Sequence, residues 1–95
     1  MKSSQKEIDF YKRCDEVLYY LWDPIGVSTI PEARDEYYSY LPKVFEYLNN
    51  GADKIKIGQY LNKIQKASMG LDPNYSRNIE IAEILLNWRE IIFNR

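Results

Sequence analysis

Hydrophobic positions along the chain recur with the period of an α-helix in four separate segments. The first has apolar side chains three or four residues apart, at Phe10, Cys14, Val17, Leu18 and Leu21. The last has the broadest apolar stripe, made of Ile81, Ile84, Leu85, Trp88, Ile91 and Ile92. The pattern therefore predicts an all-α fold, a compact bundle of four helices at about residues 4–21, 32–49, 53–68 and 74–93.

The ends of the first helix carry recognisable signals. Ser4-Gln5-Lys6-Glu7 has the form of a capping box, which satisfies backbone amide donors at a helix start. Pro24 lacks an amide proton, so the helix must end near Leu21 or Trp22. The same proline disfavours helical geometry at the residue before it, and we expect Asp23 to be extended.

Pro42 interrupts the second helical pattern. One solution is a continuous helix over residues 32–49 with a kink at Pro42. The other is a short turn over residues 33–40 followed by a helix that starts at the proline. We favour the continuous, kinked helix, because the apolar stripe keeps its phase across Pro42.

The turn Trp22-Asp23-Pro24-Ile25-Gly26-Val27 is apolar and aromatic where a simple connector would be polar. Asp23 can accept hydrogen bonds from amides a few residues later, and Gly26 permits a positive φ. In the favoured interpretation the turn is packed, with its apolar side chains on the helix ends. In the other, the turn also presents Trp22 or Asp23 to a partner, and the sequence leaves open whether Trp22 is core or surface.

Length and composition indicate one ordinary globular domain over residues 1–95. The chain is 45% hydrophobic and 28% charged, and it is too short for a core plus a deep substrate cleft. No apolar run approaches the roughly 20 residues of a membrane span, and the first residues lack the apolar core of a signal peptide. We therefore expect a cytoplasmic protein with no membrane partner, and the single cysteine agrees with a reducing compartment.

Charge is distributed unevenly around a net value of -1. Residues 1–50 contain nine Asp or Glu and six Lys or Arg, whereas residues 51–95 contain five and seven. Between Asp15 and Glu36 there are six acids and a single base, Arg34. Such a segment repels a phosphate backbone and attracts cations, so we expect a basic protein partner and no nucleic acid. The lysines at positions 54, 56, 63 and 66 are interpreted as a solvated helix face.

Catalytic chemistry has little support in the sequence. The chain has no histidine, the commonest general base and a common zinc ligand, and it has no phosphate-binding glycine motif. Cys14 falls in an apolar stripe and is expected in the core. A magnesium or calcium site at Asp23, Asp35 and Glu36 is the weakest hypothesis, because neighbouring residues on a helix point in different directions. We therefore predict no enzyme, no catalytic or metal-binding residues and no cofactor.

Aromatic residues provide the strongest functional signal. Seven of the nine tyrosines, together with Trp22, lie between residues 11 and 47, in the acidic half. Successive helical residues diverge by about 100°, so at least one member of each pair Tyr19-Tyr20 and Tyr37-Tyr38 should reach solvent. Exposed tyrosines among carboxylates are typical of a protein-binding surface, although tyrosines with buried rings and solvated hydroxyls remain an alternative. The predicted partner-binding residues are Asp15, Glu16, Tyr19, Tyr20, Trp22, Asp23, Asp35, Glu36 and Tyr38.

Several of these motifs also carry a family resemblance. The turn over residues 22–27, then Asp35-Glu36-Tyr37, Leu41-Pro42, Val44 and Met69-Gly70-Leu71, resembles a family of small uncharacterised bacterial all-helical proteins typified by YugE. The resemblance covers about residue 15 to the end. It implies an all-helical fold without an assigned catalytic activity, and some relatives resemble the immunity proteins found beside secreted toxins. Where the family has a further acid after Asp-Glu-Tyr, this chain has Tyr38, which weakens any metal or acid role there.

Together these observations predict a non-enzymatic protein-binding domain. The favoured hypothesis is an immunity-type inhibitor that neutralises a cognate bacterial toxin, such as a nuclease, through an acidic, tyrosine-rich face. The alternative is a self-associating structural or regulatory module. The first hypothesis fits a monomer and the second a weak homodimer, and the sequence does not decide between them.

Overall fold

The computed structural model describes residues 4–94, and the other positions of the predicted 1–95 domain lie outside the described residues. Every regular element in the described part is helical, which confirms the predicted all-α bundle of four helices. None of the helices among residues 4–94 combines the length and apolar character that crossing a bilayer requires. The elements are α1 (Gln5–Glu16), a π-helical continuation η1 (Val17–Trp22), a 3₁₀ turn η2 (Pro31–Ala33), α2 (Leu41–Asn49), α3 (Lys54–Lys63), a π-helical continuation η3 (Ile64–Ser68) and α4 (Tyr75–Phe93).

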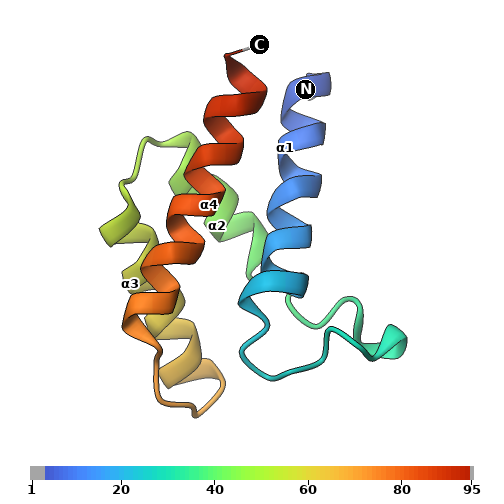
Figure 1. The fold of residues 1–95 in the computed structure, drawn as a ribbon, viewed down its shortest axis with the longest axis vertical. Coiled ribbons are helices and arrows are strands. Elements are labelled where there is room, and N and C mark those ends of the chain that lie inside the picture. Colours follow the sequence, from blue (N-terminus) through green and yellow to red (C-terminus); the bar gives the residue numbers. More distant parts are fainter. Residues whose placement is uncertain (1–3, 95) are drawn as a thin grey trace.

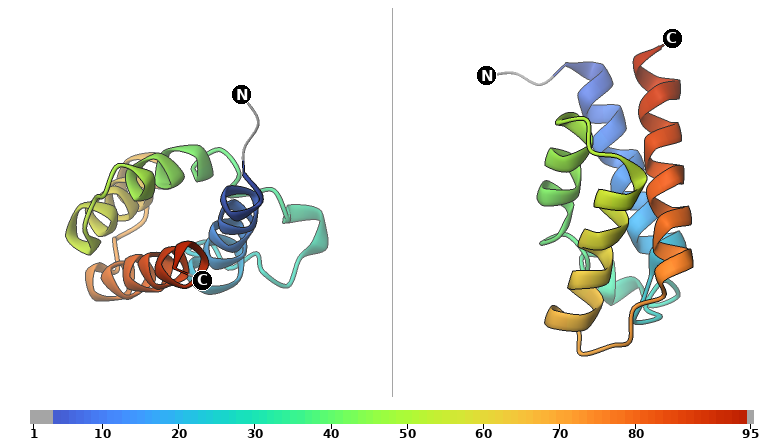
Figure 2. Two further views of the ribbon diagram at one scale, coloured as in Figure 1. Left: turned by 90° about the horizontal axis from the view of Figure 1, so that it is seen from above. Right: turned by 90° about the vertical axis from the view of Figure 1, so that its left-hand side faces the viewer.

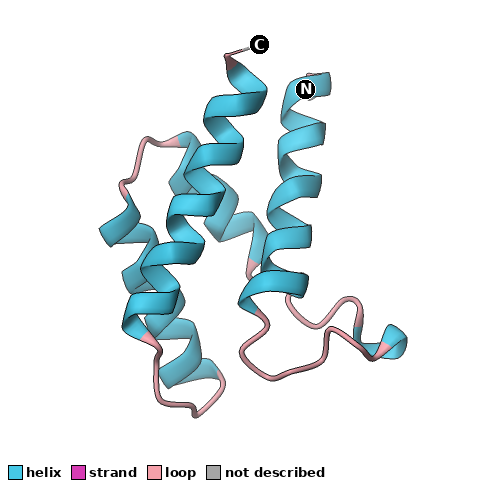
Figure 3. Ribbon diagram, viewed as in Figure 1, coloured by secondary structure: helices cyan, strands magenta, loops and turns pink. Residues whose placement is uncertain are grey.

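Helix α4 is the central element of the bundle (Figure 1). It runs antiparallel to α1 on one side and to α3 on the other, and α2 contacts α1, α3 and α4. Seen from above, α2 and α3 lie together on one side and α1 on the other (Figure 2). The loop-rich segment 23–40 leaves the end of the bundle opposite the start of α1 and projects beyond α1, away from α3 (Figure 3).

The core forms where the apolar stripes of these helices meet. Ile81, Leu85 and Ile92 of α4 are fully buried, together with Phe10 of α1 and Leu61 of α3. The last helix is therefore the main wall of the core. Its predicted stripe is only partly correct, because one of its members, the isoleucine at position 91, is exposed.

Gly58 lets α3 approach α4 closely. A Cβ atom at this position would lie 3.3 Å from Cγ1 of Ile79, closer than most real contacts. Glycine weakens a helix by about 1 kcal/mol relative to alanine. Here that local cost is offset by the close packing of the two helices.

The prediction of one continuous helix over residues 32–49 with a kink at Pro42 is wrong. The chain forms one 3₁₀ turn at Pro31–Ala33 and then successive tight turns, and α2 begins only at Leu41. Bonds between residues three apart, such as Tyr38 N to Asp35 O at 3.1 Å, close these turns. Proline cannot donate to a carbonyl four residues earlier, but it costs nothing in the first turn of a helix, where it is found here.

The first helical segment matches its predicted boundaries. Ser4 and Glu7 form the capping box, and the helix ends at Trp22. Asp23 is not extended as expected, because its φ of 32° and ψ of 59° lie in the left-handed region. This geometry still avoids the right-handed helical region that Pro24 disfavours, and aspartate tolerates it better than most residues. The amide of Asp23 donates to the carbonyl oxygen of Leu18 at 3.0 Å, which closes the helix end.

Candidate protein-binding surface

Asp23 is the organising residue of the loop after η1. Its Oδ1 accepts from the amide of Val27 at 2.8 Å and from the hydroxyl of Tyr37 at 2.7 Å, and its Oδ2 accepts from the amide of Ser28 at 3.0 Å. Burial raises the pKa of Asp23, but these hydrogen bonds outweigh burial and leave the pKa below the ordinary carboxyl value. The carboxylate predicted to meet a partner instead holds its own loop in shape.

Trp22 and Tyr19, two further predicted partner-binding residues, lie in the core. The Trp22 indole donates from Nε1 to Oδ1 of Asn78 at 2.8 Å, and its ring is almost completely buried. The Tyr19 hydroxyl lies 2.9 Å from the carbonyl oxygens of both Val27 and Ile30 and can donate to either. The packed-turn interpretation is correct for Trp22, and neither ring is available to a partner.

A buried cluster of side-chain amides holds the indole of Trp22. The indole N–H can only donate, so it must face the Oδ1 of Asn78, and this fixes the orientation of the amide. The Nδ2 of Asn78 then donates to the side-chain oxygens of Asn62, at 2.7 Å, and Gln65. Gln65 belongs to η3 and Trp22 to η1, so the amide of one α4 residue joins the two π-helical segments.

Arg34 connects the loop to the end of the first helix. Its guanidinium makes two bonds to the carboxylate of Asp15, at 3.0 and 2.7 Å, and these bonds raise the pKa of Arg34. The guanidinium carbon lies 4.5 Å from the centroid of the Tyr19 ring, 5.4 Å from that of Tyr20 and 5.8 Å from that of Tyr38. Arg34 is therefore held by one carboxylate and surrounded by three aromatic rings.

Two of the three tyrosines around Arg34 face solvent. Tyr20 and Tyr38 are 55% and 48% exposed, whereas their chain neighbours Tyr19 and Tyr37 are each 2% exposed. The prediction that one member of each tyrosine pair reaches solvent is confirmed. Arg34 is half-buried beside these two rings, although the sequence marked it only as the lone base in an acidic run.

The predicted acids fall into two groups. Asp15 is paired with Arg34, and Glu16 is paired with Arg13 at 2.8 Å, so both are neutralised within the protein. The other group is exposed and makes no ion pair among residues 4–94; it consists of Asp35, Glu36 and a residue outside the predicted set, Glu32. We call the exposed tyrosines, Arg34 and these free acids the acidic tyrosine surface: Tyr20, Glu32, Arg34, Asp35, Glu36 and Tyr38.

Shallow hollows continue this surface along the first helix. One hollow of about 280 Å³ is lined by Lys12, Arg13, Asp15, Glu16, Tyr20 and Arg34. A second, of similar volume, is lined by Tyr11, Lys12, Asp15, Tyr38 and Leu41. Both are open, and Lys12 and Asp15 border both. The shape suits contact with another protein better than enclosure of a small molecule.

Groups for metal binding or nucleophilic chemistry are sparse in the described structure. Within residues 4–94, no three His, Cys, Asp or Glu side chains gather as a metal site would require. The carboxylate of Asp23 is occupied by its loop bonds, and it is not joined by Asp35 and Glu36. Cys14 is fully buried, and burial raises its pKa to about 12, which leaves the thiol protonated and unreactive at neutral pH.

The fold and surface define an all-α domain with a preorganised, exposed aromatic group. Comparisons with protein-family models, with curated proteins and with solved structures found no match to the chain.

Proposed function

We propose that this chain is a non-enzymatic protein-binding domain, and specifically an immunity-type inhibitor that neutralises a basic bacterial toxin. The carrying observation is the arrangement at Arg34, where a bidentate bond to Asp15 fixes a guanidinium beside the exposed rings of Tyr20 and Tyr38. Tyrosine and arginine are the residue types enriched at the energetic centres of protein interfaces.

Preorganisation favours binding through these residues. A free arginine side chain loses rotamer freedom on binding, and ordering one flexible side chain costs about 0.5–1.5 kcal/mol of binding free energy. Arg34 is already fixed by Asp15 and by the ring of Tyr19 beneath it, and Tyr20 packs edge-on against Tyr19 with centroids 4.8 Å apart. Much of the ordering cost of an interface has therefore been met during folding.

The free acids give the surface its preference for a basic partner. Because Asp15 neutralises Arg34, the exposed carboxylates of Glu32, Asp35 and Glu36 leave the surface with a negative charge. Such a surface accelerates encounter with a basic protein, and salt weakens the effect. The resemblance to the YugE-like family and its immunity-protein relatives also supports a toxin as the partner, and membership of that family is part of this proposal.

Co-purification tests the proposal directly. The tagged chain is expected to capture a basic protein from a lysate of the organism that encodes it, with less capture as salt increases. Asp35→Lys/Glu36→Lys should lose the captured protein, whereas the matched control Asp72→Lys/Glu90→Lys, with the same change in charge on another part of the fold, should keep it. Tyr20→Ala/Tyr38→Ala should weaken binding by at least about tenfold, because it removes the exposed rings.

Two results would overturn the proposal. One is capture of no basic protein by the wild-type chain. The other is equal capture by the Asp35→Lys/Glu36→Lys variant and its control, which would mean that the acids do not contribute. The alternative function, self-association, is favoured by a different surface between α1 and α2.

A further inference from the structure

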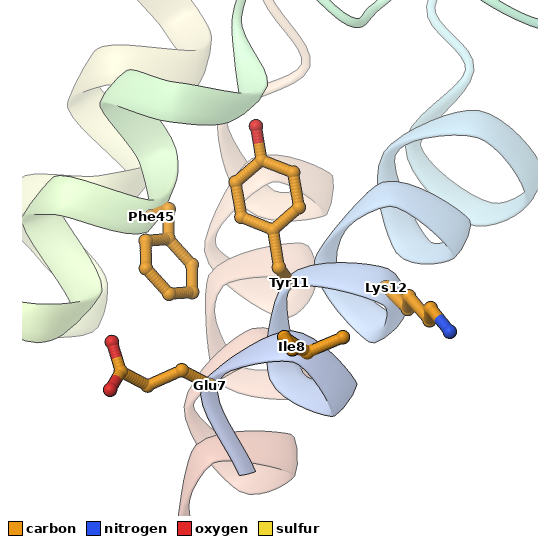
Figure 4. A pocket seen from close by; sticks show the side chains of 5 residues that line it. All are labelled: Glu7, Ile8, Tyr11, Lys12 and Phe45. Atoms are coloured by element: carbon orange, nitrogen blue, oxygen red, sulfur yellow. The ribbon is translucent and has the colours of Figure 1, made fainter. Parts of the chain in front are cut away.

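A further hollow lies between α1 and α2, and it shares Tyr11 and Lys12 with the hollow that reaches Tyr38 of the acidic tyrosine surface. It has a volume of about 420 Å³ and is lined by Glu7, Ile8, Tyr11, Lys12 and Phe45. The rings of Tyr11 and Phe45 meet edge to face with centroids 5.0 Å apart and form its aromatic wall (Figure 4). Ile8 and Tyr11 are 40% and 37% exposed, so an apolar strip of α1 faces solvent here.

Charged side chains flank this strip at both ends. Figure 4 shows the Glu7 carboxylate and the Lys12 ammonium on opposite sides, with Ile8 and Tyr11 between them. Neither Glu7 nor Lys12 forms an ion pair within residues 4–94. Glu7 uses Oε1 in the capping box with Ser4, which leaves its other oxygen for a further donor.

The order of these residues is complementary to itself. Along α1 it reads acid, apolar, two further residues, apolar, base, from Glu7 through Ile8 and Tyr11 to Lys12. If two copies of α1 pack antiparallel about a twofold axis midway between Ile8 and Tyr11, each Ile8 faces the Tyr11 of the other copy. In the same arrangement each Glu7 faces the Lys12 of the other copy. A twofold interface requires a self-complementary patch of this kind.

We infer that the protein forms a homodimer through the antiparallel α1 helices, with each Ile8 seated against the wall of Tyr11 and Phe45 in the other copy. The pair of Glu7 with Lys12 and the contact of Ile8 with Tyr11 each occur twice in the dimer. The patch is small, so the dimer is weak and depends on concentration. The dimer patch adjoins the acidic tyrosine surface at Tyr11 and Lys12, but it is built on Glu7, Ile8 and Phe45, which are not part of that surface.

Sedimentation equilibrium at increasing protein concentration tests this inference. The wild-type chain should show a reversible monomer–dimer equilibrium. Lys12→Glu should raise the dissociation constant by about tenfold or more, because two attractive pairs become two repulsive ones. The control Lys63→Glu makes the same change in charge on an exposed position of α3 and should dimerise like wild type.

A charge-swap experiment makes the test specific to the proposed pairing. Glu7→Lys alone should also fail to dimerise, with two lysines of one copy facing two of the other. An equimolar mixture of Glu7→Lys and Lys12→Glu should form a heterodimer, because every charge then faces its opposite. Thermal melting must show both variants folded, since Glu7→Lys alters the capping box; Lys12→Glu leaves that box intact and remains decisive by itself.

The inference would be overturned by a wild-type chain that stays monomeric at its highest soluble concentration. Equal dimerisation of Lys12→Glu and Lys63→Glu would also reject it, because the dimer would then use another face. If both folded charge variants are monomeric but their mixture forms no heterodimer, the antiparallel register is wrong. The capture experiment substitutes Asp35 and Glu36, and the sedimentation experiment substitutes Glu7 and Lys12. The proposed inhibitor function is therefore tested separately.

Discussion

Tyr37→Phe removes one hydroxyl from the loop and leaves the ring in place. That hydroxyl donates to Oδ1 of Asp23 at 2.7 Å and accepts from the amide of Ile25 at 3.2 Å. A hydrogen bond to a charged group contributes about 1.5–3 kcal/mol to stability. The bond from the Ile25 amide is part-buried and is lost as well, whereas the ring keeps its packing against Trp22. We expect the free energy of unfolding to fall by about 1.5–3 kcal/mol at neutral pH.

The pH dependence gives this prediction a second, independent readout. The folded pKa of Asp23 lies below its ordinary value, because the hydrogen bonds from Tyr37, Val27 and Ser28 outweigh the effect of burial. A carboxyl with a lowered folded pKa stabilises the protein above its unfolded pKa, about 4, and this contribution is lost as the pH falls through the folded pKa. Tyr37→Phe raises the folded pKa of Asp23, so its cost should be full at neutral pH and smaller in acid.

Urea unfolding at neutral pH and at about pH 3 measures both quantities. The matched control is Tyr38→Phe, because the hydroxyl of Tyr38 makes no hydrogen bond within residues 4–94 and its ring is exposed. The control should stay within about 0.5 kcal/mol of wild type. The role assigned to the Asp23 clamp would be refuted if Tyr37→Phe cost no more than Tyr38→Phe, or if its cost were the same at both pH values.

Three further predictions concern the core. Asn78→Ala removes the acceptor of the Trp22 indole and should lower the free energy of unfolding by about 2–4 kcal/mol in the same urea assay; a loss below about 1 kcal/mol would contradict the buried amide cluster. Leu85→Ala, at a fully buried position, should cost about 2–5 kcal/mol, and Leu21→Ala, at a position 45% exposed, clearly less, whereas equal losses would contradict the assigned core. Cys14, with its pKa raised to about 12, should resist iodoacetamide until the chain is unfolded, and rapid labelling of the native protein would argue against its burial.

Local physics explains which features of the fold could be predicted. Helical periodicity depends only on the spacing of apolar residues, and the capping box depends on residues three apart. The divergence of neighbouring side chains on a helix also predicted that Tyr20 or Tyr19 would be exposed. Which member would be exposed required the position of the loop, whose carbonyl oxygens accept from the hydroxyl of Tyr19.

The error at Pro42 shows where periodicity is insufficient. The apolar stripe keeps its phase across the proline, which suggested a continuous helix. Tight turns closed by bonds between residues three apart can also place Tyr37 and Leu41 in the core, with almost the same spacing. The missing amide proton of Pro42 favours a helix start there, and this local effect outweighed the pattern.

The sequence by itself determined that four helices form, the capping box of the first, most of the apolar faces and the concentration of acids and tyrosines in one half of the chain. Only the tertiary structure decided which of those residues remain available to a partner. Asp15 is neutralised by an arginine nineteen residues away, and the indole of Trp22 is satisfied by an amide fifty-six residues away on α4. Neither partnership has a local signature, because each exists only once distant helices and the loop have packed and excluded water.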